Sequence, residues 1–166
     1  MKFLKLFYLL LIIVVSSYAA SRTELLNLEK DAIVFGNGPT QVYAFVDPMC
    51  HKSKDYISFI SEEQKLLEKN TYYVFLHRLE KFPSDKVIDY IYEAEYPKEA
   101  LLAVMVDNKK VVSEQLLKTV DAKRARIDKA ADSTGMTRRP YLLIYPEGSN
   151  ICKASEGVPP CMDDWE

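Results

Sequence analysis

The sequence predicts an α/β domain from two buried strands and the helix between them. Residues 42–46 of a strand expected over 41–46, and residues 72–79, carry apolar side chains at consecutive positions. Charge enters the second run only near its end, a pattern typical of strands covered on both faces. From Cys50 to about Asn70 the apolar residues instead recur at the spacing of one helix face. A strand, a helix of about 20 residues and a second strand form a βαβ unit, whose two strands run parallel.

The composition is that of an ordinary globular chain. Its 166 residues are 48% hydrophobic and 28% charged, and the 22 Lys and Arg nearly balance the 24 Asp and Glu. These values exclude the disordered, collagen-like and coiled-coil classes. They also lack the basic excess of a nucleic-acid binder.

The start of the chain has the pattern of a secretory signal peptide. Two lysines precede an apolar run at 4–15, and small residues up to Ala19 fit a cleavage site. The run is shorter than the roughly 20 residues of a transmembrane helix, so an uncleaved anchor is the weaker alternative. We therefore expect residues 1–19 to be removed and the protein to be periplasmic.

Two short elements precede the βαβ unit. Residues 22–30 favour a polar helix, and residues 31–35 favour a short strand that runs into a glycine-rich turn at 36–39. The first buried strand of the unit ends at Asp47, because the proline that follows breaks it.

Beyond the second buried strand the pattern becomes helical up to Pro140. The Pro-Ser-Asp segment at 83–85 marks a helix start, Pro97 suits the first turn of another helix, and residues 109–131 carry apolar side chains at helical spacing. We therefore expect a helical insertion over about 82–134.

The last part of the chain predicts a β-hairpin. Residues 141–145 form a third buried strand, residues 146–150 a turn, and residues 151–153 a short partner strand. Neither a repeat nor a linker interrupts the sequence, so a single domain is expected over residues 20–166.

Cys50 is the candidate reactive residue because it follows a buried strand and begins a helix. Sites of open α/β sheets lie at the carboxyl ends of strands. The free N–H groups and partial positive charge of a helix N-terminus stabilise a thiolate over a thiol. His51 and Lys52 add positive charge nearby, whereas Asp47 opposes it. The alternative is an inert buried cysteine.

Ser53 stands three residues after Cys50, which makes the motif C-x-x-S. Residues i and i+3 are neighbours on a helix, so we expect the Ser53 hydroxyl to donate a hydrogen bond to the Cys50 thiolate. An ordinary solvated serine is the alternative. The motif lacks the second thiol of a dithiol enzyme.

Two segments resemble a known family. Residues 33–38 (IVFGNG) and 42–53 (VYAFVDPMCHKS) resemble the start of the catalytic domain of DsbC/DsbG-type periplasmic disulfide isomerases, where a strand, an acidic residue and a turn lead into C-x-x-C. Residues 135–144 (GMTRRPYLLI) are similar to the cis-proline loop and strand of the thioredoxin superfamily. The resemblance implies a thioredoxin-like fold with a helical insertion between the second core strand and the cis-proline strand. It also implies Cys50 as the nucleophile and Pro140 as a cis-proline that faces it and presents backbone to a bound peptide.

The chain departs from the family at three points: Ser53 replaces the resolving cysteine, Arg139 stands where a small or apolar residue is usual, and the N-terminus is too short for a dimerisation domain. With Ser53, a mixed disulfide on Cys50 must wait for an outside thiol or a substrate cysteine. That disfavours a net oxidase and permits a monothiol isomerase, a sulfenic-acid reductase or a carrier of small thiols. Arg139 either adds charge near the thiolate or binds an acidic group; a surface arginine is the alternative.

Substrate contacts are expected around the thiol. Exposed apolar side chains at Met49 and Tyr141 would bind unfolded segments, and His51 and Arg139 complete the predicted substrate-binding set.

Cys152 and Cys161 are the remaining cysteines. In an exported chain their simplest pairing is with each other, since of the possible pairings only this one leaves Cys50 free. On the chain-entropy model a loop this short stabilises the fold by roughly 2.5 to 3 kcal/mol. An exposed, redox-active bond is the alternative.

The sequence thus predicts an exported thiol-disulfide oxidoreductase or isomerase that acts on extracytoplasmic proteins with cysteines through Cys50, with an external thiol as reductant. The alternative is a redox-inactive binding or assembly module that uses the former substrate groove. No cofactor, nucleic acid or, after signal cleavage, membrane is expected as a partner. No metal is expected either, because the only histidines, His51 and His77, lack the spacing of zinc ligands.

Overall fold

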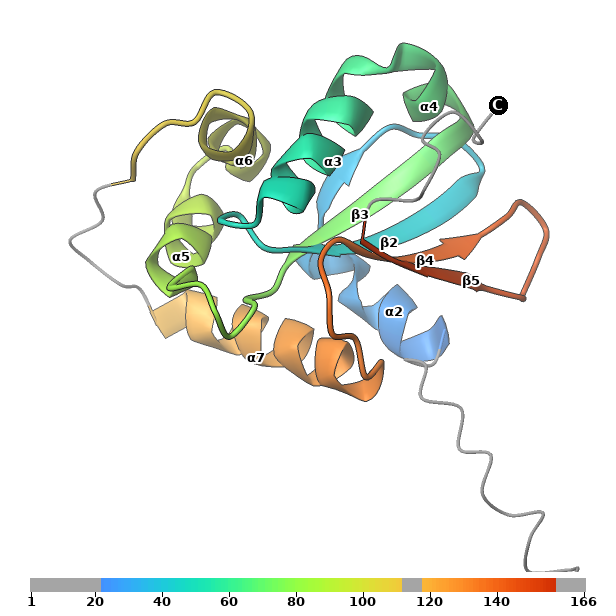
Figure 1. Ribbon diagram of the computed structural model, residues 1–166. Helices are drawn as coiled ribbons and strands as arrows, with labels where there is room; N and C mark the ends of the chain where they lie inside the picture. The colour runs from blue at the N-terminus through green and yellow to red at the C-terminus, as the bar shows by residue number, and fades with distance from the viewer. Residues whose placement is uncertain (1–21, 112–117, 158–166) are drawn as a thin grey trace, which may run out of the picture.

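The computed structural model describes residues 22–111 and 118–157. A five-stranded sheet lies between helices on its two faces (Figure 1). The strands, in sheet order, are β1 (Ile33–Phe35), β3 (Asn70–Leu76), β2 (Thr40–Val46), β4 (Tyr141–Tyr145) and β5 (Lys153–Glu156). The helices are α2 (Arg22–Leu28), the 3₁₀ turn η1 (Glu29–Asp31), α3 (His51–Glu62), α4 (Gln64–Lys69), α5 (Asp85–Glu93), α6 (Pro97–Met105) and α7 (Lys118–Ser133).

The βαβ unit forms as predicted. β2 and β3 are parallel, whereas the other neighbouring strands described here pair antiparallel. The chain crosses from β2 to β3 through α3 and α4, which lie on one side of the sheet, while α2 and α7 lie on the other (Figure 1). The register pairs Val46 with Leu76, so both strands end at the same edge. The predicted α/β class is confirmed.

Both strands of this unit are buried on their two faces. Tyr43, Phe45 and Phe75 are fully buried, and the rings of Phe45 and Phe75 lie 5.2 Å apart across the strand pair. Gly38 lets the turn before β2 pack tightly, because a Cβ there would lie 2.0 Å from the backbone of Lys69. The turn before β2 therefore packs directly against the end of α4, which fixes the position where β2 begins.

Two element boundaries within the first half differ from the prediction. The single helix expected up to Asn70 is broken at Glu63, whose extended backbone (ψ 91°) separates α3 from α4. The second buried strand ends at Leu76 rather than at Leu79, and the chain then turns toward α5.

The later elements are displaced from their predicted positions. The helix predicted to begin at 109 is not helical over 109–111, after Asn108 takes a positive φ of 55° beyond α6, and α7 begins at Lys118. The hairpin partner of β4 is 153–156 rather than 151–153, since Ile151 is 78% exposed and the register pairs Tyr141 with Glu156.

The predicted signal peptide, residues 1–19, lies outside the described residues. Within 22–111 and 118–157, no helix has the length and apolar character needed to cross a bilayer. α5, α6 and α7 fill the interval between β3 and β4, where no strand is described.

Candidate active site

Cys50 is the N-cap of α3, directly beyond β2. Its backbone is extended (φ −81°, ψ 122°), and its N–H donates a 3.0 Å hydrogen bond to the carbonyl of Asp47. The side chain is 7% exposed, and its Sγ lies 3.8 Å from the carbonyl oxygen of Arg139, as a thiol donating to that oxygen. The peptide bond between Arg139 and Pro140 is cis, as the resemblance implies. The structure therefore brings the predicted nucleophile and the cis-proline loop together.

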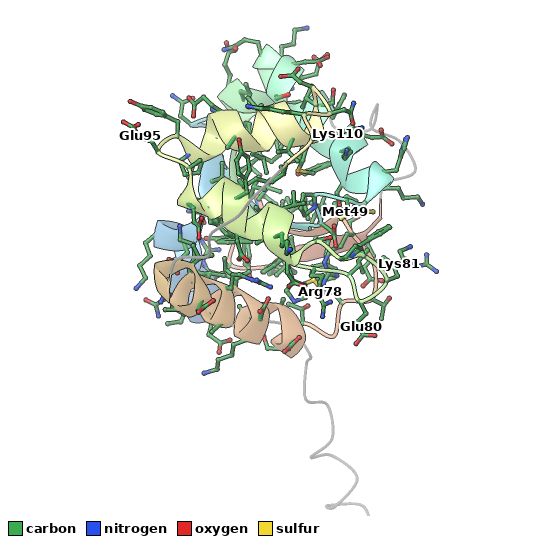
Figure 2. The ribbon with its side chains drawn as sticks, turned by 90° about the vertical axis from the view of Figure 1, so that its left-hand side faces the viewer. Met49, Arg78, Glu80, Lys81, Glu95 and Lys110 are labelled. Carbon is green, nitrogen blue, oxygen red and sulfur yellow. The ribbon has the colours of Figure 1, made fainter. Side chains whose placement is uncertain are left out.

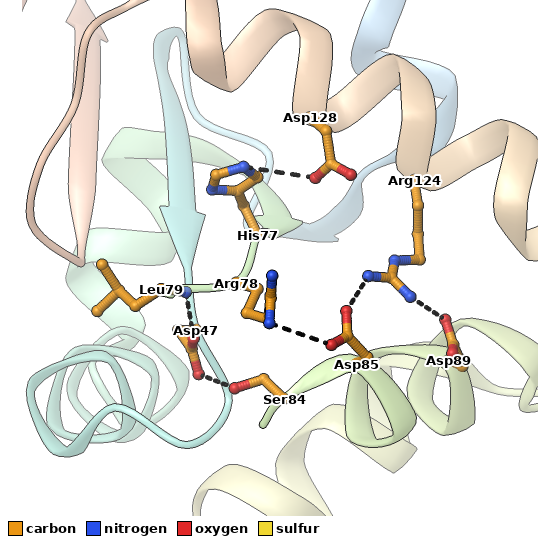
Figure 3. A network of polar contacts seen from close by, with 9 residues as sticks. All are labelled: Asp47, His77, Arg78, Leu79, Ser84, Asp85, Asp89, Arg124 and Asp128. Carbon is orange, nitrogen blue, oxygen red and sulfur yellow. Dashed lines mark hydrogen bonds and ion pairs between the residues drawn. The ribbon is translucent and has the colours of Figure 1, made fainter. Parts of the chain in front are cut away.

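The carboxylate of Asp47 organises the loop that carries Cys50. It is fully buried and accepts hydrogen bonds from the N–H of Met49 (2.8 Å), the hydroxyl of Ser84 (2.7 Å) and the N–H of Leu79 (2.6 Å). Figure 3 shows the last two of these bonds reaching it from the loop that follows β3. The sequence predicted only an opposing charge here; the structure adds that Asp47 joins the loop that carries Cys50 to the loop after β3.

Ser53 does not contact the thiol as predicted. Its side chain is fully buried, and its hydroxyl accepts a 3.2 Å hydrogen bond from the backbone N–H of Asp47. Among the hydrogen bonds of the described residues, none joins this hydroxyl to Cys50. The prediction of a hydrogen bond to the sulfur is therefore wrong, and so is the alternative of a solvated serine. The side chain turns inward to satisfy a buried donor at the end of β2.

Arg139 is buried beside Cys50, so the alternative of a surface arginine is wrong. It is 4% exposed, and one guanidinium nitrogen, Nη2, contacts Nδ1 of His77. Nη1 donates to the carbonyl of Arg138 at 2.9 Å, and the buried Nε has no partner. On the other side of the imidazole, Nε2 of His77 lies 3.4 Å from Oδ1 of Asp128 on α7 (Figure 3).

The protonation state of this group follows from its contacts. Burial, helped by the positive charge of Arg139, lowers the pKa of His77 to about 4, so the imidazole is neutral at pH 7. A guanidinium only donates hydrogen bonds, so Nδ1 accepts and the ring proton sits on Nε2, facing Asp128. Burial also raises the pKa of Asp128 and lowers the pKa of Arg139.

The other predicted substrate-binding residues differ in exposure. Met49 is 41% exposed beside Cys50. His51 is also exposed, and its Nδ1 lies 2.8 Å from the carboxylate of Asp55, one helical turn further along α3. The expected exposure of Tyr141 is wrong: it is 7% exposed, because β4 lies inside the sheet between β2 and β5.

The predicted disulfide stays a prediction, because Cys161 lies outside the described residues. Cys152 is partly buried just before β5 and forms no disulfide with Cys50, the other cysteine in the described part of the chain. The hydroxyl of Tyr145 is near Cys152, and burial raises the pKa of that tyrosine.

A pocket of about 1170 Å³ opens beside Cys50. Its walls come from the start of α3, the loop after β3, α7 and the segment before β4; among the lining residues are Cys50, Lys52, His77, Phe82, Met136 and Arg139. Figure 2 shows Arg78, Glu80 and Lys81 of the loop after β3 on the same side of the molecule as Met49. The pocket is therefore bordered by both apolar and charged side chains.

Ion pairs fasten one wall of this pocket. Arg124 of α7 pairs with both Asp85 and Asp89 of α5, the latter at 3.0 Å, and Arg78 lies 3.5 Å from Asp85 (Figure 3). These contacts join the loop after β3 to two helices. In the described part of the chain, no cluster of His, Cys, Asp and Glu has the arrangement to hold a metal ion.

His77 and Asp128 were not among the predicted site residues, although the sequence carried a signal for His77. The N–H of His77 donates to the carbonyl of Val46 at 2.9 Å, so this residue follows β3 at the edge where Cys50 follows β2. The rule that sites lie at the carboxyl ends of parallel strands applies equally to both strands. Asp128 had no such signal, because only the packing of α7 brings it there.

No protein-family model and no curated protein sequence matches this chain. Solved structures with a similar fold include a disulfide interchange protein from Neisseria gonorrhoeae, with a TM-score of 0.62, 18% identity and coverage of 82% of this chain and 91% of that one. The catalytic domain of ScsC from Proteus mirabilis has a TM-score of 0.62, 12% identity and coverage of 82% and 90%. DsbG from Helicobacter pylori has a TM-score of 0.55, 16% identity and coverage of 74% and 62%. The thioredoxin-like fold predicted from the resemblance is confirmed.

Proposed function

We propose that this protein is an exported thiol-disulfide oxidoreductase or isomerase in which Cys50 acts alone. The observation that carries the proposal is the position of the Cys50 sulfur, at the N-terminus of α3 and 3.8 Å from the Arg139 carbonyl in the cis-proline loop. The similar folds of proteins named for disulfide interchange support the same chemistry. Export is inferred from the signal-peptide pattern of residues 1–19.

In the first step the Cys50 thiolate attacks one sulfur of a substrate disulfide. A new S–S bond forms between Cys50 and that sulfur as the substrate bond breaks, and the second substrate sulfur leaves as a thiolate. The N–H groups at the start of α3 and the guanidinium of Arg139 favour the attacking thiolate. The cavity and the exposed Met49 give the adjoining chain of the substrate a place to lie.

The second step must come from outside the motif. Ser53 carries no sulfur, and its buried hydroxyl is engaged with the backbone of Asp47. A different substrate cysteine can attack the mixed disulfide, which releases a rearranged disulfide and regenerates Cys50 with no net oxidation. An external thiol can instead attack the Cys50 sulfur, which releases the reduced substrate as a thiolate and leaves Cys50 in a disulfide with that external thiol. A second external thiol then attacks this adduct and regenerates Cys50, so the two external thiols leave as a disulfide. The proposed chemistry is therefore isomerisation or reduction.

Trapping of covalent adducts tests the proposal. Because Ser53 stands where a dithiol enzyme has its resolving cysteine, the natural protein should accumulate mixed disulfides with extracytoplasmic proteins, visible on non-reducing gels and identifiable by mass spectrometry. Cys50→Ser should abolish these adducts, and Cys152→Ser should leave them. The proposed enzymatic function would lose its main support if adducts persist in Cys50→Ser, or if the wild-type protein forms no adducts.

The pocket also suits a redox-inactive binding module, since most of its lining comes from residues other than Cys50. That function predicts that Cys50→Ser keeps both partner and phenotype. Loss of both in the same variant favours the oxidoreductase.

A further inference from the structure

We propose that His77 is a positioning residue, a neutral imidazole that holds the Arg139 guanidinium beside Cys50 and leaves its positive charge available to the thiolate. The inference rests on the proposed function, because it concerns the reactivity of the same sulfur. It differs from that function in assigning a role to a residue that has no contact with the reacting atom.

The orientation of the imidazole is fixed from three directions. The backbone N–H of His77 donates to the carbonyl of Val46 at 2.9 Å, which anchors the residue to the end of β2. Nδ1 faces Nη2 of Arg139, and Nε2 faces Oδ1 of Asp128 at 3.4 Å. Arginine can only donate, so Asp128 and Arg139 together select the tautomer that carries its proton on Nε2.

Arg139 has no carboxylate partner within ion-pair distance among the described residues. The nearby negative groups that act on it are Asp47, Glu156, Asp132 and the thiolate form of Cys50. The carboxylate of Asp47 already accepts three hydrogen bonds from the loops around it. No described carboxylate therefore neutralises the guanidinium, and the Cys50 thiol, which donates to the Arg139 carbonyl, lies close to the same residue.

The choice of histidine has a physical reason. A carboxylate at position 77 would hold Arg139 equally well, but it would neutralise the guanidinium and place a negative charge near Cys50. A neutral acceptor orients the donor and leaves its charge in a buried environment, where attraction to a thiolate is stronger than in water. The charged groups that act on His77 are the positive side chains of Arg139, Arg124 and Arg78 and the negative side chain of Asp128.

Alkylation of Cys50 measured against pH provides the test. The full chain is treated with iodoacetamide, and mass spectrometry of its peptides reads Cys50 against a short unstructured peptide with one cysteine, added as the reference thiol. His77→Asn keeps a neutral acceptor near the place of Nδ1 and should retain the wild-type pH profile. His77→Asp should move the midpoint upward by about one pH unit, which is about a tenfold loss of rate near pH 6.

A double-mutant cycle separates positioning from the direct effect of the new carboxylate. In an Arg139→Met background, His77→Asp should have a clearly smaller effect than in the wild type. Thermal unfolding of each variant identifies any that fails to fold, and Asp128→Asn then serves as a second route, with a smaller upward shift expected from loss of the tautomer-selecting acceptor.

Equal effects of His77→Asp in both backgrounds, or a wild-type profile in His77→Asp itself, would overturn the positioning role while the proposed function stands. If Cys50 of the wild-type protein alkylates with the profile of the reference peptide, the proposed function fails first. The two failures are therefore distinguishable in one data set.

Discussion

Two chain segments meet at Cys50, and they differ in how their buried polar groups are satisfied. In the segment from Asp47 to Ser53, the buried side chains of Asp47 and Ser53 both have partners: the Asp47 carboxylate accepts three hydrogen bonds, and the Asp47 N–H donates to the Ser53 hydroxyl. In the segment that ends at Pro140, Arg139 is also buried, yet its Nε has no partner, and no carboxylate of residues 22–111 and 118–157 forms an ion pair with its guanidinium.

This difference separates stability from reactivity. Satisfied buried hydrogen bonds hold a loop in one conformation, and their loss is costly. An uncompensated buried cation is unfavourable for folding, but it stabilises a negative charge that forms next to it. We infer that the Asp47 segment gives the sulfur its place and that the Arg139 segment gives it its reactivity.

The largest effect is expected on the satisfied side. Asp47→Ala leaves the N–H groups of Met49 and Leu79 and the hydroxyl of Ser84 without their acceptor, so the free energy of unfolding should fall by about 3 to 5 kcal/mol. Urea denaturation followed by circular dichroism measures the change. Asp55→Ala, which removes an exposed carboxylate from α3, is the matched control and should change stability by less than about 0.5 kcal/mol. Similar losses in both variants would contradict the scaffold role.

The histidine beside Arg139 gives the next effect. The pKa of His77 falls from the ordinary 6.5 to about 4 on folding, so between these values the unfolded chain binds more protons than the folded one. Its contribution is complete above about pH 6.5, and the free energy of unfolding should fall by about 2 kcal/mol at pH 5.

Denaturation of the wild type and His77→Asn at pH 7 and pH 5 isolates this term, since every other group titrates in both proteins. His51→Asn is the control for loss of an imidazole, because it removes the exposed histidine of α3 and leaves His77 in place. If His77→Asn loses as much stability at pH 5 as the wild type, the imidazole is not held neutral by its surroundings.

Arg139 should show the opposite balance from Asp47. Arg139→Met keeps the aliphatic bulk and removes an unpaired buried charge, so stability should stay within about 1 kcal/mol of the wild type. Alkylation of Cys50 near pH 6 should slow about tenfold, because the thiolate loses a buried positive charge that interacts with it. Arg138→Met removes the neighbouring exposed arginine and should leave the rate unchanged. A large loss of stability with an unchanged rate would reverse the proposed division between the two segments.

The fold was largely predictable from the sequence, because burial and period are local signals. The consecutive apolar residues around Tyr43 and Phe75 exist because those strands are covered on both faces, so they report their own environment. The break at Glu63 and the displaced hairpin strand were not predictable in the same way. They depend on how the chain meets its neighbours, as in the pairing of Tyr141 with Glu156.

The site was predictable only in part for a related reason. Cys50 and Pro140 stand in recognisable motifs, and the structure brings their segments together. A sequence motif does not show which way a side chain points, however, and the Ser53 hydroxyl points toward the backbone of Asp47 instead of the sulfur. Asp128 contacts His77 from α7, and the two residues are too far apart in the sequence for a spacing rule to relate them.

Ser53 provides the smallest effect and the sharpest contrast with the sequence-based interpretation. Ser53→Ala leaves the buried N–H of Asp47 without its acceptor and should lower the free energy of unfolding by about 1 to 2 kcal/mol. The alkylation profile of Cys50 should not change, because no hydrogen bond joins the hydroxyl to the sulfur in the described structure. Ser58→Ala, which alters a partly exposed hydroxyl further along α3, controls for loss of a serine from the helix. If Ser53→Ala is as stable as Ser58→Ala but slows alkylation of Cys50, the Ser53 hydroxyl stabilises the thiolate. Both Cys50 and Ser53 then take part in the chemistry of the C-x-x-S motif.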